Sequence, residues 1–369
     1  MNTLDLTKNK AEIGELNAGF VRSKMPADRR QTSNALAFLI FLATFAAYSA
    51  TFWAIVFAPF WIIKLIAIPL NALLIGSLLI IGHDACHGSF TSNKYINQTI
   101  GRIAFFASLI PFSAWEVSHN QLHHGWTNFK QHDVYIPLSK TEYDSLSAFG
   151  RLIQRLYRTF FGVVFLYQIE TWIKHLIFPR KSDFKRMNRK IFYFDITLVL
   201  VFLVFQIISL VLIAPYLANL LGLTIQPPII LILTSLILPY CISAWLYALT
   251  TVNQHTHPKV PWFDKKSEWD FFNSQVQSVV HMKLPKILGL TFLDALEHTA
   301  HHVDVKIPLY RLKKSQKALH QYFSEAITVG NWSFIQFYRN MKICKLYDYD
   351  NHCWMDFDGN PTSKRLLIK

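Results

Sequence analysis

Two long blocks without charged side chains limit the folds open to this chain more than any other feature. The first covers residues 31–83 and contains one charge, Lys64; the second covers 191–251 and contains only Asp195. A helix needs about 20 mostly apolar residues to cross a bilayer, so each block is long enough for two crossings. The composition agrees, because 52% of the residues are hydrophobic and only 16% are charged.

The two blocks predict two helical hairpins. We place the first pair of spans at about 36–57 and 61–82, joined by a tight turn at Pro59. The second block is interrupted by Gln226-Pro227-Pro228, which divides it into another pair. The predicted fold is therefore an all-α integral membrane protein with four transmembrane helices in two hairpins and a histidine-rich helical cap on the cytoplasmic side.

The distribution of Lys and Arg predicts which face is cytoplasmic. Segment 1–35 holds 6 of these residues, 83–190 holds 14 and 252–369 holds 16, so that only Lys64 of the 37 lies elsewhere. Cytoplasmic loops carry such an excess, which places both termini in the cytoplasm and, in a bacterium, the protein in the inner membrane. The chain is treated as one domain, 1–369, made of a cytoplasmic segment 1–35, a first hairpin 36–82, a cytoplasmic and interfacial segment 83–190, a second hairpin 191–251 and a cytoplasmic segment 252–369.

Other features argue against other classes of protein. Residues 103–115 and 159–169 are uncharged but too short to cross, so they are expected to form interfacial or re-entrant helices. The first 33 residues lack the pattern of a signal peptide. The four cysteines show no paired spacing, which argues against a disulfide scaffold. The net charge of +14 is assigned to the cytoplasmic face and its anionic lipids, not to nucleic acid.

Three histidine clusters lie at or beyond the ends of the predicted spans. HDACH begins directly after the second span, HNQLHH lies within 83–190 and HTAHH lies within 252–369. The first pair is spaced four residues apart, which stacks two side chains on one face of a helix. Both hairpins return to one membrane face, so residues over 200 positions apart can meet there. The clusters hold eight of the 15 histidines: His83, His87, His119, His123, His124, His298, His301 and His302.

These residue types predict a centre with two metal ions. Imidazole is the commonest protein ligand for transition metals, and eight imidazoles exceed what one ion can use. The chain has no Cys-x-x-Cys pair, and the spacing of the clustered histidines leaves out the carboxylates that soluble di-iron bundles use as ligands. Neutral imidazoles at two centres favour iron that binds dioxygen. Asp84 and Glu297 flank the clusters, where they either accept an N–H from a ligand or are simply solvated.

The remaining histidines and the tryptophans near the clusters are interpreted separately. His255, in QHTHP at the end of the fourth span, lies level with His83 and is either a ninth ligand or a packed side chain. His132, His175, His257 and His281 are left outside the site, although His281 could support a ligand by a hydrogen bond. Three tryptophans are expected to be interface anchors or packing residues: Trp115, Trp126 and Trp262.

The order HDACH, HNQLHH, HTAHH resembles the three histidine boxes of the membrane fatty acid desaturase superfamily. The longer strings HDACHGSF, HHGWTN, QHTHPKVPWFDKKSEWDF and HTAHHVDVKIPLYRL look most like the acyl-lipid omega-6 (delta-12) and omega-3 desaturases of bacteria and plants. The likeness runs from about residue 35 to the C-terminus. It implies that the eight box histidines bind two irons and that His255 is a further ligand.

The resemblance also implies a reaction. A desaturase of this kind would use dioxygen as co-substrate to insert a cis double bond into an acyl chain linked to a membrane lipid. The most similar enzymes imply a delta-12, or omega-6, double bond. The chain contains no haem motif, no Gly-x-Gly-x-x-Gly fingerprint and no iron-sulfur cysteine set. Electrons are therefore expected from an external carrier of the ferredoxin or cytochrome b5 type. The basic stretches 180–190 and 306–317 suit an acidic carrier or, alternatively, anionic lipid.

Three alternatives follow from the same residues. A di-iron hydroxylase or ketolase of alkanes, sterols or carotenoids would use the same boxes, and only analysis of the product separates it from a desaturase. A membrane haem-binding or metal-transport protein would need histidines within its spans, whereas here they lie at the ends. A purely structural membrane protein would leave eight clustered histidines without a purpose.

Overall fold

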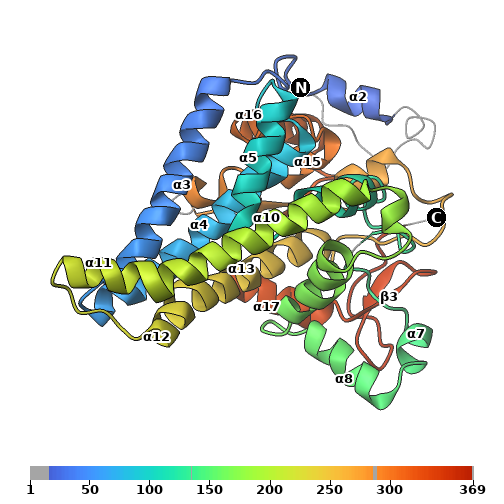
Figure 1. The fold of residues 1–369 in the computed structure, drawn as a ribbon. Helices are drawn as coiled ribbons and strands as arrows, with labels where there is room; N and C mark the ends of the chain where they lie inside the picture. The colour runs from blue at the N-terminus through green and yellow to red at the C-terminus, as the bar shows by residue number, and fades with distance from the viewer. Residues whose placement is uncertain (1–15, 134, 286–288, 368–369) are drawn as a thin grey trace.

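The computed structural model describes residues 16–133, 135–285 and 289–367 and is mostly helical (Figure 1). The α-helices are α2 (Ala18–Ser23), α3 (Asn34–Phe57), α4 (Trp61–His87), α5 (Lys94–Phe106), α6 (Phe112–Trp115), α7 (Lys140–Asp144), α8 (Ala148–Tyr157), α9 (Val163–Phe165), α10 (Arg189–Ile208), α11 (Ala214–Leu220), α12 (Pro228–Ile232), α13 (Leu238–His255), α14 (Gly289–Phe292), α15 (His298–Val303), α16 (Leu309–Phe323) and α17 (Phe334–Ile343). The π-helical segments are η1 (Glu116–His123), η2 (Leu166–Ile177), η4 (Ser209–Ile213), η5 (Leu233–Ile237) and η6 (Asn273–Gln277), and η3 (Asp183–Lys185) is a 3-10 turn. The strands are β1 (Val280–Lys283), β2 (Thr328–Asn331), β3 (Leu346–Asp348) and β4 (Cys353–Met355).

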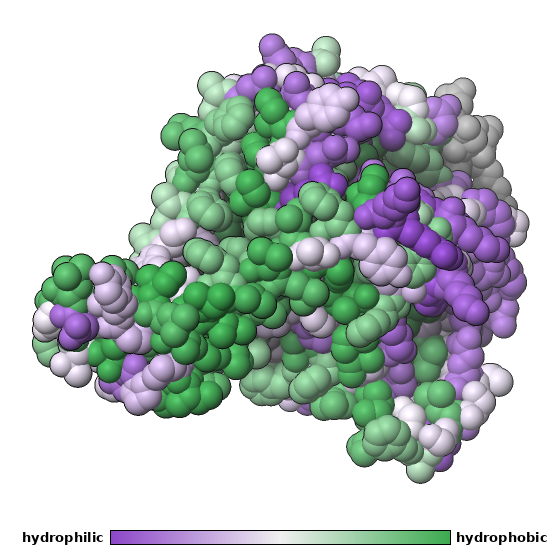
Figure 2. All heavy atoms as spheres, in the orientation of Figure 1, coloured by the Kyte–Doolittle hydropathy of each residue, from purple (hydrophilic) through white to green (hydrophobic). Residues whose placement is uncertain are grey.

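Among the residues that the structure describes, four helices are long and apolar enough to cross a membrane, as the sequence predicts. They are α3, α4, the continuous rod α10–η4–α11 and the rod α12–η5–α13. Large apolar side chains on them face outward, for example Leu39 (65% exposed) and Val201 (59% exposed). Hydrophobic residues predominate from the middle of the molecule toward the end formed by α11 and α12, whereas hydrophilic residues gather at the opposite side (Figure 2). Soluble monomers rarely expose apolar patches of this extent, so the surface is that of a membrane protein.

Helix α4 is the centre of the apolar part, since it contacts α3, α5 and α13. Three residues separate it from the end of α3. The corner is fixed by Lys64, whose Nζ donates to the Ile55 carbonyl at 2.7 Å. The Lys64 side chain is thus buried, not extended toward the membrane surface. Asn71 on α4 donates to the Tyr48 carbonyl and the Thr51 hydroxyl on α3. These polar contacts hold the first two spans together where no water can compete.

Helix α10 is joined to the segment that follows α4 by its single carboxylate. Asp195 accepts hydrogen bonds from Arg102 Nε of α5 at 2.7 Å and from the backbone N–H of Ser113 at 2.8 Å. The predicted interfacial helix 103–115 is broken, because Leu109 adopts a positive φ of 54° and Pro111 precedes α6. The other predicted short helix, 159–169, is found as α9 and the start of η2.

The C-terminal segment corrects the expectation of an all-α chain. Strand β1 pairs in parallel with β2, and β3 pairs with β4 in antiparallel fashion. These strands are three or four residues long, too short for a pattern of alternating side chains to be visible in the sequence. The second pair is held by its own aromatic core, in which Tyr347 lies opposite Trp354 and both pack near Trp262. Tertiary packing, not local preference, forms these strands.

Candidate metal centre

The first histidine pair lies on the last two turns of α4. His83 and His87 are both helical, and their Nε2 atoms approach to 3.3 Å. The helix ends at Gly88, which has a φ of 66°, a conformation that glycine adopts without steric cost. The chain therefore turns away directly after His87, and the predicted helical pair is confirmed.

The second cluster lies on a π-helix, a feature that the spacing of its residues does not predict. The N–H of His124 donates to the carbonyl of His119, five residues earlier, at 3.0 Å. In an α-helix residues five apart are rotated by roughly 140°, but the wider π-turn brings both imidazoles to one side. Their Nε2 atoms lie 3.0 Å apart. His123 points to the other side of the same turn, toward His255 and His302.

The third cluster lies on the short helix α15, which faces both earlier elements. His301 Nε2 lies 3.1 Å from His124 Nε2, and His298 Nε2 lies 3.0 Å from His255 Nε2. His255 is the last residue of α13, the fourth span. The end of that span therefore reaches the same point as the end of α4, as the predicted topology requires.

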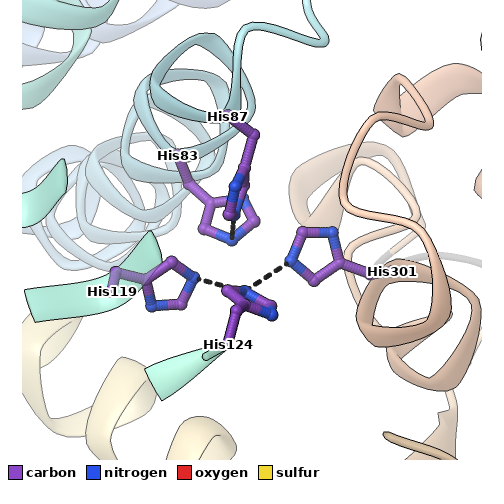
Figure 3. A group of neighbouring side chains, drawn as sticks. All are labelled: His83, His87, His119, His124 and His301. Atoms are coloured by element: carbon purple, nitrogen blue, oxygen red, sulfur yellow. Dashed lines mark hydrogen bonds between the residues drawn. The ribbon is translucent and has the colours of Figure 1, made fainter. Parts of the chain in front are cut away.

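The nine histidines form two adjacent groups. In each group one ring nitrogen per residue lies within 4.8 Å of the others. Figure 3 shows the first group, in which side chains from α4, the η1 turn and α15 converge from three directions. The five-histidine group is His83, His87, His119, His124 and His301, and the four-histidine group is His123, His255, His298 and His302.

The spacing of the nitrogens fits two metal ions. Ligands at right angles around an ion with metal–nitrogen bonds of about 2.1 Å are separated by roughly 3 Å, and the Nε2 pairs lie 3.0 to 3.3 Å apart. The Nε2 atom of His302 is buried and has no hydrogen-bond partner. A donor set of neutral imidazoles suits iron, copper or zinc, so the residues fit the iron that the sequence predicts.

Hydrogen bonds fix three members of the four-histidine group. His123 Nδ1 lies 2.7 Å from Asp133 Oδ1, and His255 Nδ1 lies 3.1 Å from Asn128 Oδ1. His302 Nδ1 lies 3.0 Å from Gln275 Oε1. Each acceptor keeps the proton on Nδ1 and leaves Nε2 free for a metal. Sequence analysis missed all three acceptors, because nothing in their spacing marks them as neighbours of a histidine.

Burial keeps five of the nine imidazoles neutral. It lowers the pKa of His119, His124 and His301 well below the usual value, and neighbouring histidines lower it further. The same cause lowers the pKa of His298 and His302. A neutral imidazole has a free lone pair, which is the form that binds metal. The groups are therefore ready to bind metal at neutral pH.

Neither of the two carboxylates that flank the clusters orients a box histidine, which was one of the two interpretations of their positions. Asp84 Oδ1 is 3.9 Å from His83 Nδ1, and its carboxylate instead accepts the backbone N–H of Leu309 at 2.7 Å. Glu297 lies 3.2 Å from His281, which is outside both groups. Burial raises the pKa of Glu297 to about 7. Being next to a ligand in sequence does not make either carboxylate its partner, since consecutive helical residues point in different directions.

The histidines left outside the site by sequence analysis lie outside both groups. His257 accepts the N–H of Lys259, His132 packs on Trp126, and His175 lies 3.4 Å from Asp183. The His281 ring lies 5.0 Å from that of His320. None of the four shares a hydrogen bond with a box histidine in the described part of the chain.

Two of the three singled-out tryptophans support the site. The Trp115 ring stacks on His119 with centroids 4.8 Å apart and an interplanar angle of 25°. Trp262 is fully buried, and its Nε1 donates to the carbonyl of His255 at 3.1 Å. Trp126 stacks on Trp269. The packing interpretation of Trp115 and Trp262 is confirmed.

An elongated, mostly apolar cavity borders both groups. It contains about 1150 Å³ of space outside protein atoms, part of it open to the surroundings, and lies between α4 and α13. Its wall extends along α4 from Ala72 to His83, which corresponds to about 16 Å of helix. Ser243 and Tyr247 line it from α13. The apolar lining suits a long apolar chain that reaches the histidines.

Comparison with known proteins gives a consistent result. Residues 59–330 match the sequence profile of a family described as fatty acid desaturase. The chain is 25% identical to the chloroplastic omega-6 fatty acid desaturase of Spinacia oleracea over 84% of its own length and 65% of that protein, so it spans about two thirds of this relative. It is 25% identical to the sn-1 oleoyl-lipid 12-desaturase of Picosynechococcus over 84% of both chains. It is 26% identical to an sn-1 acyl-lipid omega-3 desaturase (ferredoxin) of Nostoc over 66% of its own length and 63% of that protein.

Proposed function

The chain belongs to the fatty acid desaturase family, and we propose that it inserts a cis double bond at the delta-12, or omega-6, position of an acyl chain linked to a membrane lipid. The names of two relatives support this position, since one acts on omega-6 and another on oleoyl lipid at carbon 12. We further propose that the nine histidines hold two irons, five ligands at one and four at the other.

One observation carries the proposal: two groups of imidazoles lie at the end of an apolar cavity between two membrane-spanning helices. When bound, the irons would supply the reduction of dioxygen that removal of hydrogen from an unactivated methylene requires. The protein's residues position the chain. Apolar walls on α4 and α13 align it, and His83, His119 and His298 lie where the cavity meets the ligands.

The stoichiometry requires an external reductant. Formation of one double bond and reduction of one dioxygen to two waters consumes two hydrogens from the chain, two further electrons and two protons. The Nostoc relative is named as a ferredoxin-dependent enzyme. We propose a ferredoxin as donor, with a cytochrome b5-type carrier as the alternative.

The proposed activity is tested by lipid analysis. The gene is expressed in a host that makes oleoyl lipids but no polyunsaturated ones, and the fatty acids are profiled with double-bond positions. The expected product is an 18-carbon chain with a second cis double bond at carbon 12. A hydroxylated or keto product would move the protein to the hydroxylase class, and a bond at another carbon would reject delta-12.

We also propose the orientation that the charge distribution predicts, with two hairpins and a cytoplasmic cap. The native thiols of Cys344 and Cys353 are buried and cannot report it. Single cysteines replacing Gly222, between α11 and α12, and the exposed Ser182 serve instead. An impermeant thiol reagent added outside intact cells should label Gly222→Cys and not Ser182→Cys. The reverse pattern would invert the topology.

A further inference from the structure

A surface platform of two tryptophans and a lysine lies outside the membrane spans. Trp126 and Trp269 stack with ring centroids 5.4 Å apart and an interplanar angle of 29°. Lys266 Nζ lies 3.6 Å from the Trp269 centroid and 4.6 Å from that of Trp126. Lys266 is exposed and both indoles are partly exposed. We call these three residues the tryptophan platform.

The platform is connected to the four-histidine group by a short chain of hydrogen bonds. Trp269 Nε1 donates to the carbonyl of Thr127 at 2.9 Å. The Thr127 hydroxyl lies 3.3 Å from His302 Nδ1 and 3.2 Å from Gln275 Oε1. Gln275 also contacts His302 Nδ1, and its amide donates to the His124 carbonyl. Thr127 is thus the one residue between a surface indole and a candidate metal ligand.

Basic side chains lie at and near the platform. His132 packs on Trp126, and Arg186 and Lys266 are close enough to lower its pKa, after burial as the main cause. Two of the three carboxylates in residues 264–270 are engaged with neighbours, since Glu268 pairs with His352 and Asp270 binds Asn273. The third, Asp264, keeps its Oδ1 buried without a hydrogen-bond partner. Lys265 pairs with Asp350. Lys266 has no carboxylate within 4 Å among the residues that the structure describes.

The other basic stretch is less available. Within 306–317, Arg311 and Lys314 pair with Asp28, and Lys306 Nζ donates to the His87 carbonyl. Those side chains hold the N-terminal segment and the end of α4. From the stretch 180–190, Arg186 is close enough to His132, which packs on Trp126, to lower the pKa of that imidazole.

We propose that an acidic one-electron carrier docks on the tryptophan platform and that electrons enter the four-histidine group through Trp269, Thr127 and His302. The inference rests on the proposed function, because only an oxygen-dependent reaction needs these electrons. Each turnover takes two electrons from two reduced carriers, one at a time, and releases two oxidised carriers. Exposed tryptophans are the side chains that most often dominate a binding surface, and the surrounding cations would steer the carrier.

The docking surface is tested by binding. Oxidised [2Fe–2S] ferredoxin is titrated against the purified, detergent-solubilised protein at low salt. Lys266→Glu and Arg186→Glu should each weaken binding by about tenfold, since each inverts the charge beside the carrier. Lys317→Glu is the matched control, because it makes the same change at an exposed position of the other stretch, and it should leave binding unchanged. Weaker ferredoxin binding only in Lys317→Glu would overturn the proposal. Adhesion to anionic vesicles is measured with the same variants. If Lys266→Glu weakened adhesion to the vesicles and left ferredoxin binding unchanged, the platform would bind lipid and the proposal would be overturned.

The route is tested by rates of reduction. Trp269→Phe keeps an aromatic ring but loses the N–H to Thr127, whereas Trp126→Phe keeps that bond. At saturating ferredoxin, stopped-flow spectra should show slower electron transfer in Trp269→Phe and not in Trp126→Phe. Equal rates in both would reject the route. Failure of the proposed function is distinguishable, because wild-type protein reduced by dithionite and given oxygen would then form no unsaturated product, while the ferredoxin titration would still report on the platform.

Discussion

The two histidine groups are held in place by different means. In the four-histidine group, three of the four imidazoles have an acceptor on Nδ1, namely Asp133, Asn128 or Gln275. In the five-histidine group, the Nδ1 atoms of His124 and His301 are buried without a partner. That group is ordered by helix geometry and by packing of rings on rings. Hydrogen bonding orients one group and packing orients the other, so the two should respond to different substitutions.

Loss of a candidate ligand should have the largest effect in either group. His301→Ala removes a nitrogen from the five-histidine group and His302→Ala removes one from the four-histidine group. Both substitutions should abolish turnover and lower bound iron from two per chain toward one. The reason is that the buried, mostly apolar surroundings supply no other side chain to replace the lost imidazole. Iron analysis and fatty acid profiling measure this.

The control for these variants is His257→Ala, which removes a buried imidazole outside both groups. It should keep the iron and most of the activity. If either ligand variant released both irons, the groups would not load independently, and if both kept two irons and activity, the ligand assignment would be wrong.

The next effect should distinguish the groups. Asp133→Asn removes the charge that supports His123 and should lower iron affinity or activity by about 10- to 100-fold. Asp84→Asn is its counterpart beside the five-histidine group, where the carboxylate does not reach the imidazole. We expect at most a few-fold loss there. Iron affinity is measured by chelator competition. Similar large losses of affinity in both variants would contradict the view that hydrogen bonds orient only the four-histidine group.

Packing around the five-histidine group can be tested at Gly82. A Cβ at this position on α4 would run into the Phe105 ring, and such overpacking costs about 1–3 kcal/mol. Gly82→Ala should therefore lower the thermal stability of the protein and weaken iron binding at the adjacent His83. Gly76→Ala is the control, since its Cβ would meet nothing nearer than Ser243 Oγ at 3.9 Å. Equal melting temperatures of Gly82→Ala and Gly76→Ala would show that α4 and α5 move apart to accept the extra methyl group without loss of stability.

The smallest effects should come from the supporting tryptophans. Trp262→Phe loses the hydrogen bond to His255, which is worth about 0.5–1.5 kcal/mol. Trp115→Leu loses the ring that stacks on His119, worth about the same amount. Each substitution should lower iron affinity, measured by chelator competition, by roughly 2- to 10-fold. Trp262→Phe acts on the four-histidine group and Trp115→Leu on the five-histidine group. A loss as large as that of Asp133→Asn would mean that the tryptophans also contact the substrate.

The membrane-spanning helices were predicted well from the sequence, because a span depends on local composition and length alone. The four spans are found as helices, and Gly88 and His255 end α4 and α13 near the predicted limits. The two small sheets were missed, because strands of three or four residues carry no periodic signal. The π-turn of η1 was also missed, and without it His119 and His124 would not share a side.

The sequence by itself determined that this is a membrane protein with clustered histidines and a desaturase-like order of motifs, because these properties lie in residue types and spacing. Only the tertiary structure decided how the histidines divide. His123 and His124 are neighbours in sequence yet belong to different groups, as do His301 and His302. Successive helical side chains point about 100° apart, so two adjacent ligands face two centres. Asp133, Asn128 and Gln275 became partners of histidines only because the folded chain brings distant turns within hydrogen-bonding distance.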